Sequence, residues 1–259
     1  MAKLPIHNLL RFHVPRPLPT RAAYALWAQT YPPWPHNPLM HAEQAVVAPI
    51  IASTRPVRAL DVGTGSGRYL PLLAATGARL VVGVDFSLPM LAAGREGTKH
   101  HESTKGLDAA RRVCGDAYQL PFRDASFDLV VSSLMVGDVA ELAGWASELA
   151  RVLASGGHLI YSDFHPAWAA RGWRRTFQTI DGRSLEIAYF PHTIDEHLAV
   201  LAERSFDVRA IREPRLAPPD ELARRARSGP RDVPVVVVFH AVKRGPARPP
   251  RPATRAGRE

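Results

Sequence analysis

A glycine-rich loop that begins at an aspartate is the part of the chain best suited to bind a ligand. Residues 59–67 read Ala-Leu-Asp-Val-Gly-Thr-Gly-Ser-Gly, so a short apolar stretch runs into glycines at alternate positions. Because glycine has no side chain, a ligand can lie directly against the backbone of such a loop. A helix is expected over 68–75, and its first N–H groups favour a ligand carboxylate beside the loop.

The spacing of these glycines argues against two common nucleotide-binding motifs. A dinucleotide fingerprint, Gly-x-Gly-x-x-Gly, requires a third glycine where this chain has Arg68 or Leu70. A P-loop requires Gly-Lys-Ser/Thr, which does not follow the loop. A nicotinamide-dependent oxidoreductase built on a similar sheet is kept as the alternative enzyme class, with the missing glycine against it.

Two further aspartates follow apolar stretches and could bind the polar parts of a nucleoside. Asp85 follows the stretch 80–84 and lies 18 residues beyond Gly67. In a doubly wound sheet this places its carboxylate at the end of the neighbouring strand, where it can accept hydrogen bonds from both hydroxyls of a ribose. Asp116, within Gly-Asp-Ala, could accept from an adenine amino group. Without the glycine loop, a cap for Asp85 and a turn for Asp116 would be the simpler explanations.

Apolar strands and helices alternate along the chain and would position these residues. The expected strands are 57–62, 80–84, 111–114, 127–132 and 157–162, and the expected helices between and after them are 68–75, 88–95 and 139–153. Strands that are apolar on both faces and alternate with helices predict a parallel sheet covered by helices. After a helix at 193–204, strands 206–211 and 233–242 have no helix between them, which predicts a terminal antiparallel hairpin.

The predicted fold is α/β, with a doubly wound, mostly parallel seven-stranded sheet. Residues 1–54 are expected to form an irregular segment and a helical lid, with helices at 21–31 and 39–53. Residues 55–242 are expected to form the main domain, in which 163–192 is a cap or insertion after the fifth strand. Residues 243–259 are expected to be a disordered basic tail, because proline and arginine dominate there without a hydrophobic pattern.

Charge and cysteine content narrow the classes of partner. The formal net charge is +9, but the tail from Lys243 to Glu259 carries +5 of it, and the chain does not alternate aromatic with basic residues as nucleic-acid binders do. No apolar run is long enough to span a bilayer, and the first residues do not resemble a secretory signal. The single cysteine, Cys114, excludes an intrachain disulfide. We therefore expect a cytoplasmic protein with no nucleic-acid or membrane partner.

In their order and separation, these motifs resemble the class I S-adenosylmethionine-dependent methyltransferases of the small-molecule type (methyltransferase type 11-like). The resemblance covers roughly residues 55–163. It rests on Asp-x-Gly-x-Gly-x-Gly from Asp61, on Asp85 at the end of the second strand, and on the sequences Gly-Asp-Ala-Tyr-Gln-Leu-Pro-Phe at 115–122 and Phe-Asp-Leu-Val at 127–130.

The resemblance implies S-adenosyl-L-methionine as the cofactor and assigns its contacts. The glycine loop would hold the amino acid end of the cofactor, with Asp61 facing its ammonium group. Asp85 would hold the ribose, and Asp116 would meet the adenine amino group. The full set of implied cofactor-binding residues is Asp61, Gly63, Thr64, Gly65, Gly67, Asp85, Phe86, Asp116, Ala117, Ser132, Ser133 and Tyr31.

The methyl acceptor would bind beside the cofactor. Met135, after the fourth strand, would shape the transfer site. Tyr24 or Tyr31 would close over the cofactor from the N-terminal helix, although packing of this helix against the body explains its aromatic residues as well. Trp168 lies in an aromatic insertion that could form an apolar substrate wall, although packing of the insertion onto the body explains these aromatics as well. The arginines of the insertion, Arg171, Arg174 and Arg175, could contact an acidic substrate, but they are expected to face water.

Asp163 and His165, in Ser-Asp-Phe-His-Pro, are the candidate general bases. They follow the fifth strand, whose carboxyl end opens towards the crevice of a doubly wound sheet, and histidine accepts a proton near neutral pH. A local cap for Asp163 and a turn role for His165 explain the two residues equally well. No set of residues has a metal-ligand spacing.

The sequence thus predicts an S-adenosylmethionine-dependent methyltransferase, monomeric or homodimeric, that transfers a methyl group to an O, N or C atom of a small molecule. Besides the nicotinamide-dependent enzyme, a non-catalytic S-adenosylmethionine-binding protein remains an alternative.

Overall fold

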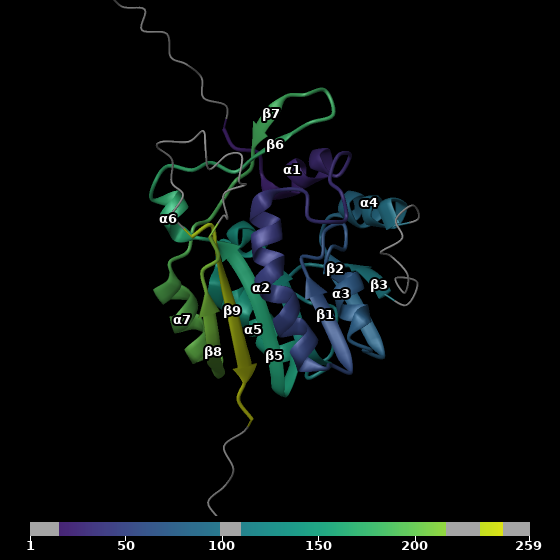
Figure 1. The fold of residues 1–259 in the computed structure, drawn as a ribbon, viewed down its shortest axis with the longest axis vertical. Coiled ribbons are helices and arrows are strands. Elements are labelled where there is room, and N and C mark those ends of the chain that lie inside the picture. The colour runs from purple at the N-terminus through teal and green to yellow at the C-terminus, as the bar shows by residue number, and fades with distance from the viewer. Residues whose placement is uncertain (1–15, 99–109, 216–233, 246–259) are drawn as a thin grey trace, which may run out of the picture.

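The computed structural model describes residues 16–98, 110–215 and 234–245. Their centre is a seven-stranded sheet with the strand order β3-β2-β1-β4-β5-β9-β8 (Figure 1). Its strands are β1 (Arg58–Val62), β2 (Leu80–Asp85), β3 (Ala110–Cys114), β4 (Phe127–Ser133), β5 (Leu153–Phe164), β8 (Phe206–Arg212) and β9 (Val236–Lys243).

Five strands of the sheet are parallel and two are not. β3, β2, β1, β4 and β5 pair in parallel, whereas β9 is antiparallel to both β5 and β8. The order reverses direction at β1 and β4, so the carboxyl ends of these two strands border the crevice in which doubly wound folds bind ligands. The predicted doubly wound sheet with a terminal antiparallel hairpin is confirmed.

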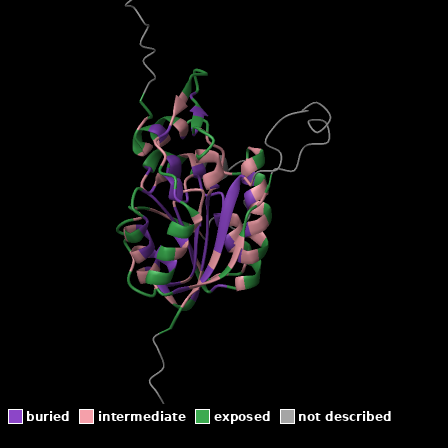
Figure 2. Ribbon diagram, turned by 90° about the vertical axis from the view of Figure 1, so that its left-hand side faces the viewer, coloured by how far each residue is buried: buried purple, intermediate pink, exposed green. Residues whose placement is uncertain are grey.

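Helices cover both faces of the sheet, and the strands between them are buried (Figure 2). On one face lie α2 (Pro38–Thr54) and α3 (Leu70–Ala75), whose apolar residues pack on Leu129, Val131 and Ile160. On the other face lie α5 (Leu142–Val152) and α7 (Ile194–Glu203), which pack on Val130 and Phe239. Because Val47 and Ile51 of α2 belong to this core, α2 is part of the body rather than of a lid.

The lid is shorter than the sequence indicates. α1 (Thr20–Trp27) ends four residues before Tyr31, and it lies near α4 (Leu88–Thr98). The insertion after β5 contains α6 (Pro166–Ala169) and a hairpin of β6 (Thr176–Gln178) and β7 (Ser184–Glu186). Ala23 of α1 is buried against Phe177 and Ile187 of the insertion, so α1 and the insertion form one cover over the crevice (Figure 1).

The predicted basic tail begins too early. Lys243 is the last residue of β9, and its Nζ donates hydrogen bonds to the carbonyl oxygens of Ala150 and Leu153, at 2.6 and 2.7 Å. Arg244 forms an ion pair with Asp207, at 3.0 Å. These contacts tie the start of the predicted tail to the body, and residues 246–259 lie outside the described part of the chain.

Candidate functional site

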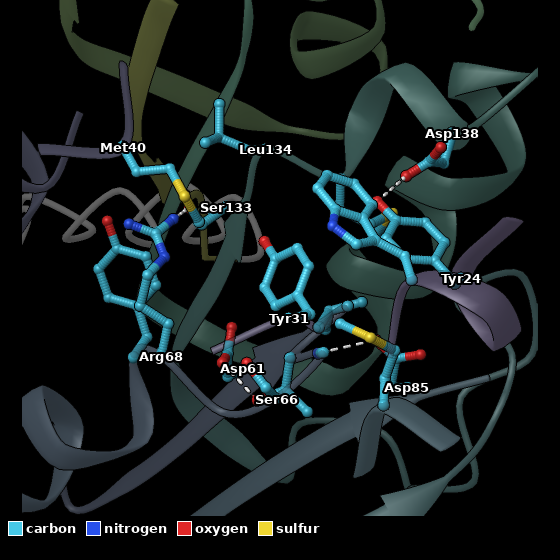
Figure 3. Close-up of a pocket in the computed structure, with 18 of the residues that line it drawn as sticks. Tyr24, Tyr31, Met40, Asp61, Ser66, Arg68, Asp85, Ser133, Leu134 and Asp138 are labelled. Carbon is cyan, nitrogen blue, oxygen red and sulfur yellow. Dashed lines mark hydrogen bonds between the residues drawn. The ribbon is translucent and has the colours of Figure 1, made fainter. Parts of the chain in front are cut away.

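A cavity of about 370 Å³ opens at the carboxyl ends of β1, β2 and β4, beneath α1 and the insertion (Figure 3). The glycine loop forms its floor, and aromatic residues of the N-terminal segment face that floor. Eleven of the residues predicted from the sequence line it: Tyr24, Tyr31, Asp61, Gly63, Thr64, Gly65, Asp85, Phe86, Ala117, Ser133 and Met135.

The loop needs glycine for two separate reasons. Gly63 and Gly65 have positive φ angles of 71° and 56°, a region that residues with a side chain rarely adopt. A Cβ atom on Gly63 would also lie 2.4 Å from Cγ of Met135, which closes over the loop from the end of β4. The backbone of the loop therefore stays bare towards the cavity.

Asp85 shapes this loop as well as facing the cavity. One of its carboxylate oxygens accepts a hydrogen bond from Gly65 N and the other from Ser87 N, both at 2.8 Å. Burial raises the pKa of Asp85, and the two backbone N–H groups oppose this rise. Each oxygen keeps a lone pair for a further donor, such as a ligand hydroxyl.

Asp61 lies beneath the loop, where it is 2% exposed. Its Oδ2 accepts a hydrogen bond of 2.6 Å from the Thr64 hydroxyl. Burial raises the pKa of Asp61 to about 7, and the Thr64 bond and the Arg68 charge partly oppose this rise. A carboxyl group with this pKa can respond to a cationic group placed above the loop.

A buried ion pair that sequence reasoning missed supports the loop from α2. Glu43 is fully buried and accepts hydrogen bonds from Arg68 Nη1 at 2.9 Å and from the Tyr69 hydroxyl at 2.7 Å. Its other oxygen accepts from the hydroxyls of Ser133 and Ser162, at 2.6 and 2.8 Å. Glu43 thus joins α2, the segment after the glycine loop, β4 and β5. Its place in an apolar helix was the only signal in the sequence.

A second ion pair closes the cavity on the side of α1. Arg175 Nη1 donates to Asp138 Oδ1 at 2.6 Å, and the Tyr24 hydroxyl donates to Asp138 Oδ2 at 2.9 Å. Arg175 Nη2 also donates to the Tyr24 hydroxyl. The expectation that Arg175 faces water is wrong, because its side chain is 6% exposed. Arg174 does face water, and it pairs with Glu186.

Aromatic rings of the N-terminal segment lie above the loop. Tyr31 projects into the middle of the cavity in Figure 3, and the Trp27 ring packs edge-on to it at a centroid distance of 4.8 Å. Tyr24 packs against Phe86, and the Arg21 guanidinium lies 4.7 Å from the centre of the same Phe86 ring. These contacts give α1 the covering position that the sequence indicates.

Three predicted cofactor residues do not line the cavity. Asp116 is exposed, and its carboxylate accepts a hydrogen bond from Tyr118 N at 2.9 Å, which is the turn role considered as its alternative. Ser132 is fully buried within β4. Gly67 lies at the far end of the loop, where its φ of 92° serves the turn into α3.

The predicted catalytic pair also lies outside the cavity lining. Asp163 is fully buried, and its Oδ2 lies 3.5 Å from Nε2 of His197 on α7. His165 caps α6 by accepting a hydrogen bond from Ala167 N at 3.2 Å, and its Nε2 lies 3.3 Å from Glu213. His165 therefore has its local role, Asp163 contacts α7, and neither contact supports the prediction that this pair borders the acceptor.

Trp168 lies beside the cavity rather than in it. It lines a separate space of about 50 Å³ together with Leu39, Phe164, Trp173 and Val235. Phe164 and Trp173 line both spaces, so they form the aromatic wall in the place expected for Trp168. Among the described residues, no group of His, Cys, Asp and Glu could hold a metal ion, and no helix has the length and apolarity needed to cross a membrane.

Comparisons with known proteins agree with this geometry. The family model described as "Methyltransferase domain" matches residues 60–161. The demethylmenaquinone methyltransferase of Clavibacter sepedonicus is 39% identical over 120 residues, which cover 44% of this chain and 46% of that protein. The biotin biosynthesis bifunctional protein BioHC of Cellvibrio japonicus is 36% identical over 124 residues, which cover 48% of this chain and 23% of that protein. The chain thus spans about half or less of the length of these relatives.

The fold is shared with a solved structure over most of the chain. An S-adenosylmethionine-dependent methyltransferase from Mesorhizobium loti matches with a TM-score of 0.61 and 22% identity, covering 78% of this chain and 98% of that one. The comparisons give no support to a nicotinamide-dependent enzyme. Residues 60–161 thus match the model of a methyltransferase domain, and the chain shares its fold with a solved S-adenosylmethionine-dependent methyltransferase.

Proposed function

We propose that this protein is an S-adenosylmethionine-dependent methyltransferase that acts on a small molecule. The observation that carries the proposal is the meeting of Asp61, the bare Gly63–Gly65 backbone and Asp85 in one cavity. This cradle fits the cofactor chemically: a carboxylate for its ammonium, a bare loop for its amino acid chain, and a second carboxylate for its ribose.

The residues around the cradle have roles that follow from their contacts. Asp85 would accept the ribose hydroxyls while keeping its bonds to Gly65 N and Ser87 N. Tyr24, Trp27 and Tyr31 would exclude water from above. When bound, the cofactor supplies a sulfonium methyl group, which is already electrophilic. The protein therefore needs mainly to align the acceptor with that methyl group and to keep water out.

The finer parts of the proposal rest on the sequence. The acceptor atom is O, N or C, and the protein is a cytoplasmic monomer or homodimer without a nucleic-acid partner. The position of the positive charge supports the absence of a nucleic-acid partner, because more than half of the net charge lies in the C-terminal tail. The single cysteine is consistent with a reducing compartment.

A screen for turnover tests the proposal. The purified protein is incubated with S-adenosylmethionine and with panels of phenols, amines and carboxylates, and the formation of S-adenosylhomocysteine is measured. We expect at least one panel to raise its formation above the rate without acceptor. Binding of the cofactor without turnover in any panel would favour a non-catalytic binding protein instead.

Cofactor binding is expected to strengthen as the pH rises from about 6 to about 8. The pKa of Asp61, about 7, lies in this range, and the carboxyl group must lose its proton to attract the cofactor's ammonium group. In Asp61→Asn we expect this rise to be much smaller. Calorimetric titration with S-adenosylhomocysteine at several pH values measures the affinity of the wild type and of the variant. An equal pH dependence of the two affinities would contradict the role of Asp61.

The same pKa has the opposite effect on the stability of the free protein. Asp61 titrates at about 7 when folded, against an ordinary value of 3.8. The folded state therefore binds this proton more tightly than the unfolded state does. Asp61 thus contributes to the free energy of unfolding in full below pH 3.8, and this contribution is lost as the pH rises towards 7. Bound cofactor is expected to reverse this trend, because the ammonium group favours the ionised carboxylate.

A further inference from the structure

The ion pair of Asp138 and Arg175 lies on a part of the cavity wall that the proposed cofactor contacts do not use. Their side chains are 4% and 6% exposed. Asp138 comes from the turn after β4 (Val136–Asp138), Arg175 from the insertion, and the associated Tyr24 from α1. All three line the cavity, and Figure 3 shows Tyr24 and Asp138 joined at its upper edge.

Stability alone does not explain this cluster. Removing two charges from water costs about as much as their attraction returns, and apolar residues of similar volume often serve as well or better. Asp138 accepts one hydrogen bond at each oxygen, from Arg175 and from Tyr24. A carboxylate oxygen can accept two bonds, so Asp138 keeps the capacity to accept a donor from a ligand in the cavity.

Asp138 also lies close to the part of the loop where the cofactor would bind. Its backbone N–H donates to the carbonyl oxygen of Met135 at 2.9 Å, and the Met135 side chain lies against Gly63. Burial raises the pKa of Asp138, although Arg175 and Tyr24 oppose the rise. A carboxylate in this setting can hold a proton more readily than one in water.

The walls around this cluster are flat and aromatic. Tyr24 stacks on Trp27 at a centroid distance of 5.9 Å, and Phe164 packs on Trp173 at 5.1 Å. The Arg175 guanidinium lies 5.3 Å from the centre of the Phe164 ring. Aromatic walls with a few polar groups at one end select a planar apolar ligand with a polar group at its edge. A hydroxyl group fits that end, because it can donate to Asp138.

We propose, building on the methyltransferase function above, that the methyl acceptor is a planar aromatic hydroxyl compound and that Asp138 takes its proton. In this step a lone pair of the hydroxyl oxygen forms a bond to the methyl carbon. The bond from that carbon to sulfur breaks, its electrons stay on sulfur, and S-adenosylhomocysteine is released. The hydroxyl proton passes to Asp138 and then to water. Tyr24 and Arg175 act as positioning residues that hold the carboxylate.

A pair of probes that differ by one hydroxyl group tests the binding part of this proposal. The affinities of 2-naphthol and naphthalene are measured with the protein saturated with S-adenosylhomocysteine. We expect the wild type to prefer 2-naphthol by about 10- to 150-fold, because the hydroxyl of 2-naphthol can donate a hydrogen bond to the charged carboxylate and naphthalene cannot. In Asp138→Asn this preference should fall to a few-fold, while the affinity for S-adenosylhomocysteine stays within about threefold of wild type.

Turnover tests the proton-transfer part. With S-adenosylmethionine, we expect the wild type to methylate 2-naphthol and Asp138→Asn to do so about 10²–10⁴-fold more slowly. Asp181→Asn is the matched control, because Asp181 is an exposed carboxylate of the β6–β7 turn that also pairs with an arginine, Arg183. Tyr24→Phe keeps the ring and removes one donor to Asp138, and it should lower the preference for 2-naphthol by about 2- to 12-fold.

Several results would overturn the proposal. These are equal affinity of the wild type for the two probes, no detectable binding of 2-naphthol, binding of 2-naphthol without methylation, or unchanged turnover in Asp138→Asn. If the ion pair is purely structural, the variants should lose affinity for both probes by the same factor, and this result would also overturn the proposal. If the wild type does not bind S-adenosylhomocysteine, the proposed function itself fails. If it binds that compound but not 2-naphthol, only the acceptor proposal fails.

Discussion

Replacing Asp85 with alanine is expected to weaken the binding of S-adenosylmethionine by about 10²–10⁴-fold, because two charge-assisted hydrogen bonds to the ribose, each about 1.5–3 kcal/mol, would be lost. The variant also loses the acceptors of Gly65 N and Ser87 N, which hold the loop against the end of β2. Calorimetric titration with S-adenosylmethionine and S-adenosylhomocysteine measures the change in affinity.

Asp128→Ala is the matched control for this variant. Asp128 also accepts hydrogen bonds from two backbone N–H groups, those of Val57 and Arg58, but it lies at the amino end of β4, away from the cavity. Both variants should lose a similar amount of thermal stability, and only Asp85→Ala should lose affinity. If a folded Asp85→Ala protein binds as tightly as the Asp128→Ala protein, Asp85 does not hold the ribose.

Replacing Glu43 with leucine is expected to lower the free energy of unfolding by about 3–5 kcal/mol, because Arg68 would remain buried without its counter-charge. The Arg68 side chain is 7% exposed, and that of Glu43 is 0% exposed. The hydroxyls of Tyr69 and Ser162 would lose their acceptor as well. Chemical denaturation with two independent probes measures the loss.

Two further proteins separate the effect of the charge from the effect of the new side chain. In the double variant Glu43→Leu, Arg68→Met the unpaired charge is gone, and we expect much of the lost stability to return. Glu203→Leu changes an exposed glutamate that lies 3.9 Å from Nη1 of Arg204, and it should cost less than about 0.5 kcal/mol. A loss below about 1 kcal/mol in Glu43→Leu would show that the pair does not hold these elements together.

The sheet and the glycine loop were predictable because the signals for them are local. Strand and helix periods fix the alternation of elements, and Gly63 and Gly65 have backbone angles that the residue type itself indicates. The ion pairs were not predictable, because their partners are far apart in the sequence. Arg175 contacts Tyr24 across 151 residues, and Arg68 contacts Glu43 across 25.

The alternation of side chains along β5 decides on which face of the sheet the Asp163 carboxylate lies, and so whether it can reach the cavity. Successive side chains of a strand point to opposite faces of the sheet. Ser162 reaches Glu43 on the side of α2, so Asp163 points to His197 on the side of α7. Being at the carboxyl end of β5 was a correct inference, but it did not determine which face the carboxylate takes. Tyr161 lies two residues before Asp163 and therefore on the same face of β5, and its apolar ring, which packs in the core, was the signal available in the sequence.

The most direct test is calorimetric titration of the purified protein with S-adenosylmethionine, S-adenosylhomocysteine and NAD. The cavity joins Asp61, a glycine loop without the dinucleotide spacing, and Asp85. We therefore expect both S-adenosyl compounds to bind at a single site and NAD to show no binding. Tight binding of NAD together with no binding of either S-adenosyl compound would contradict the methyltransferase function.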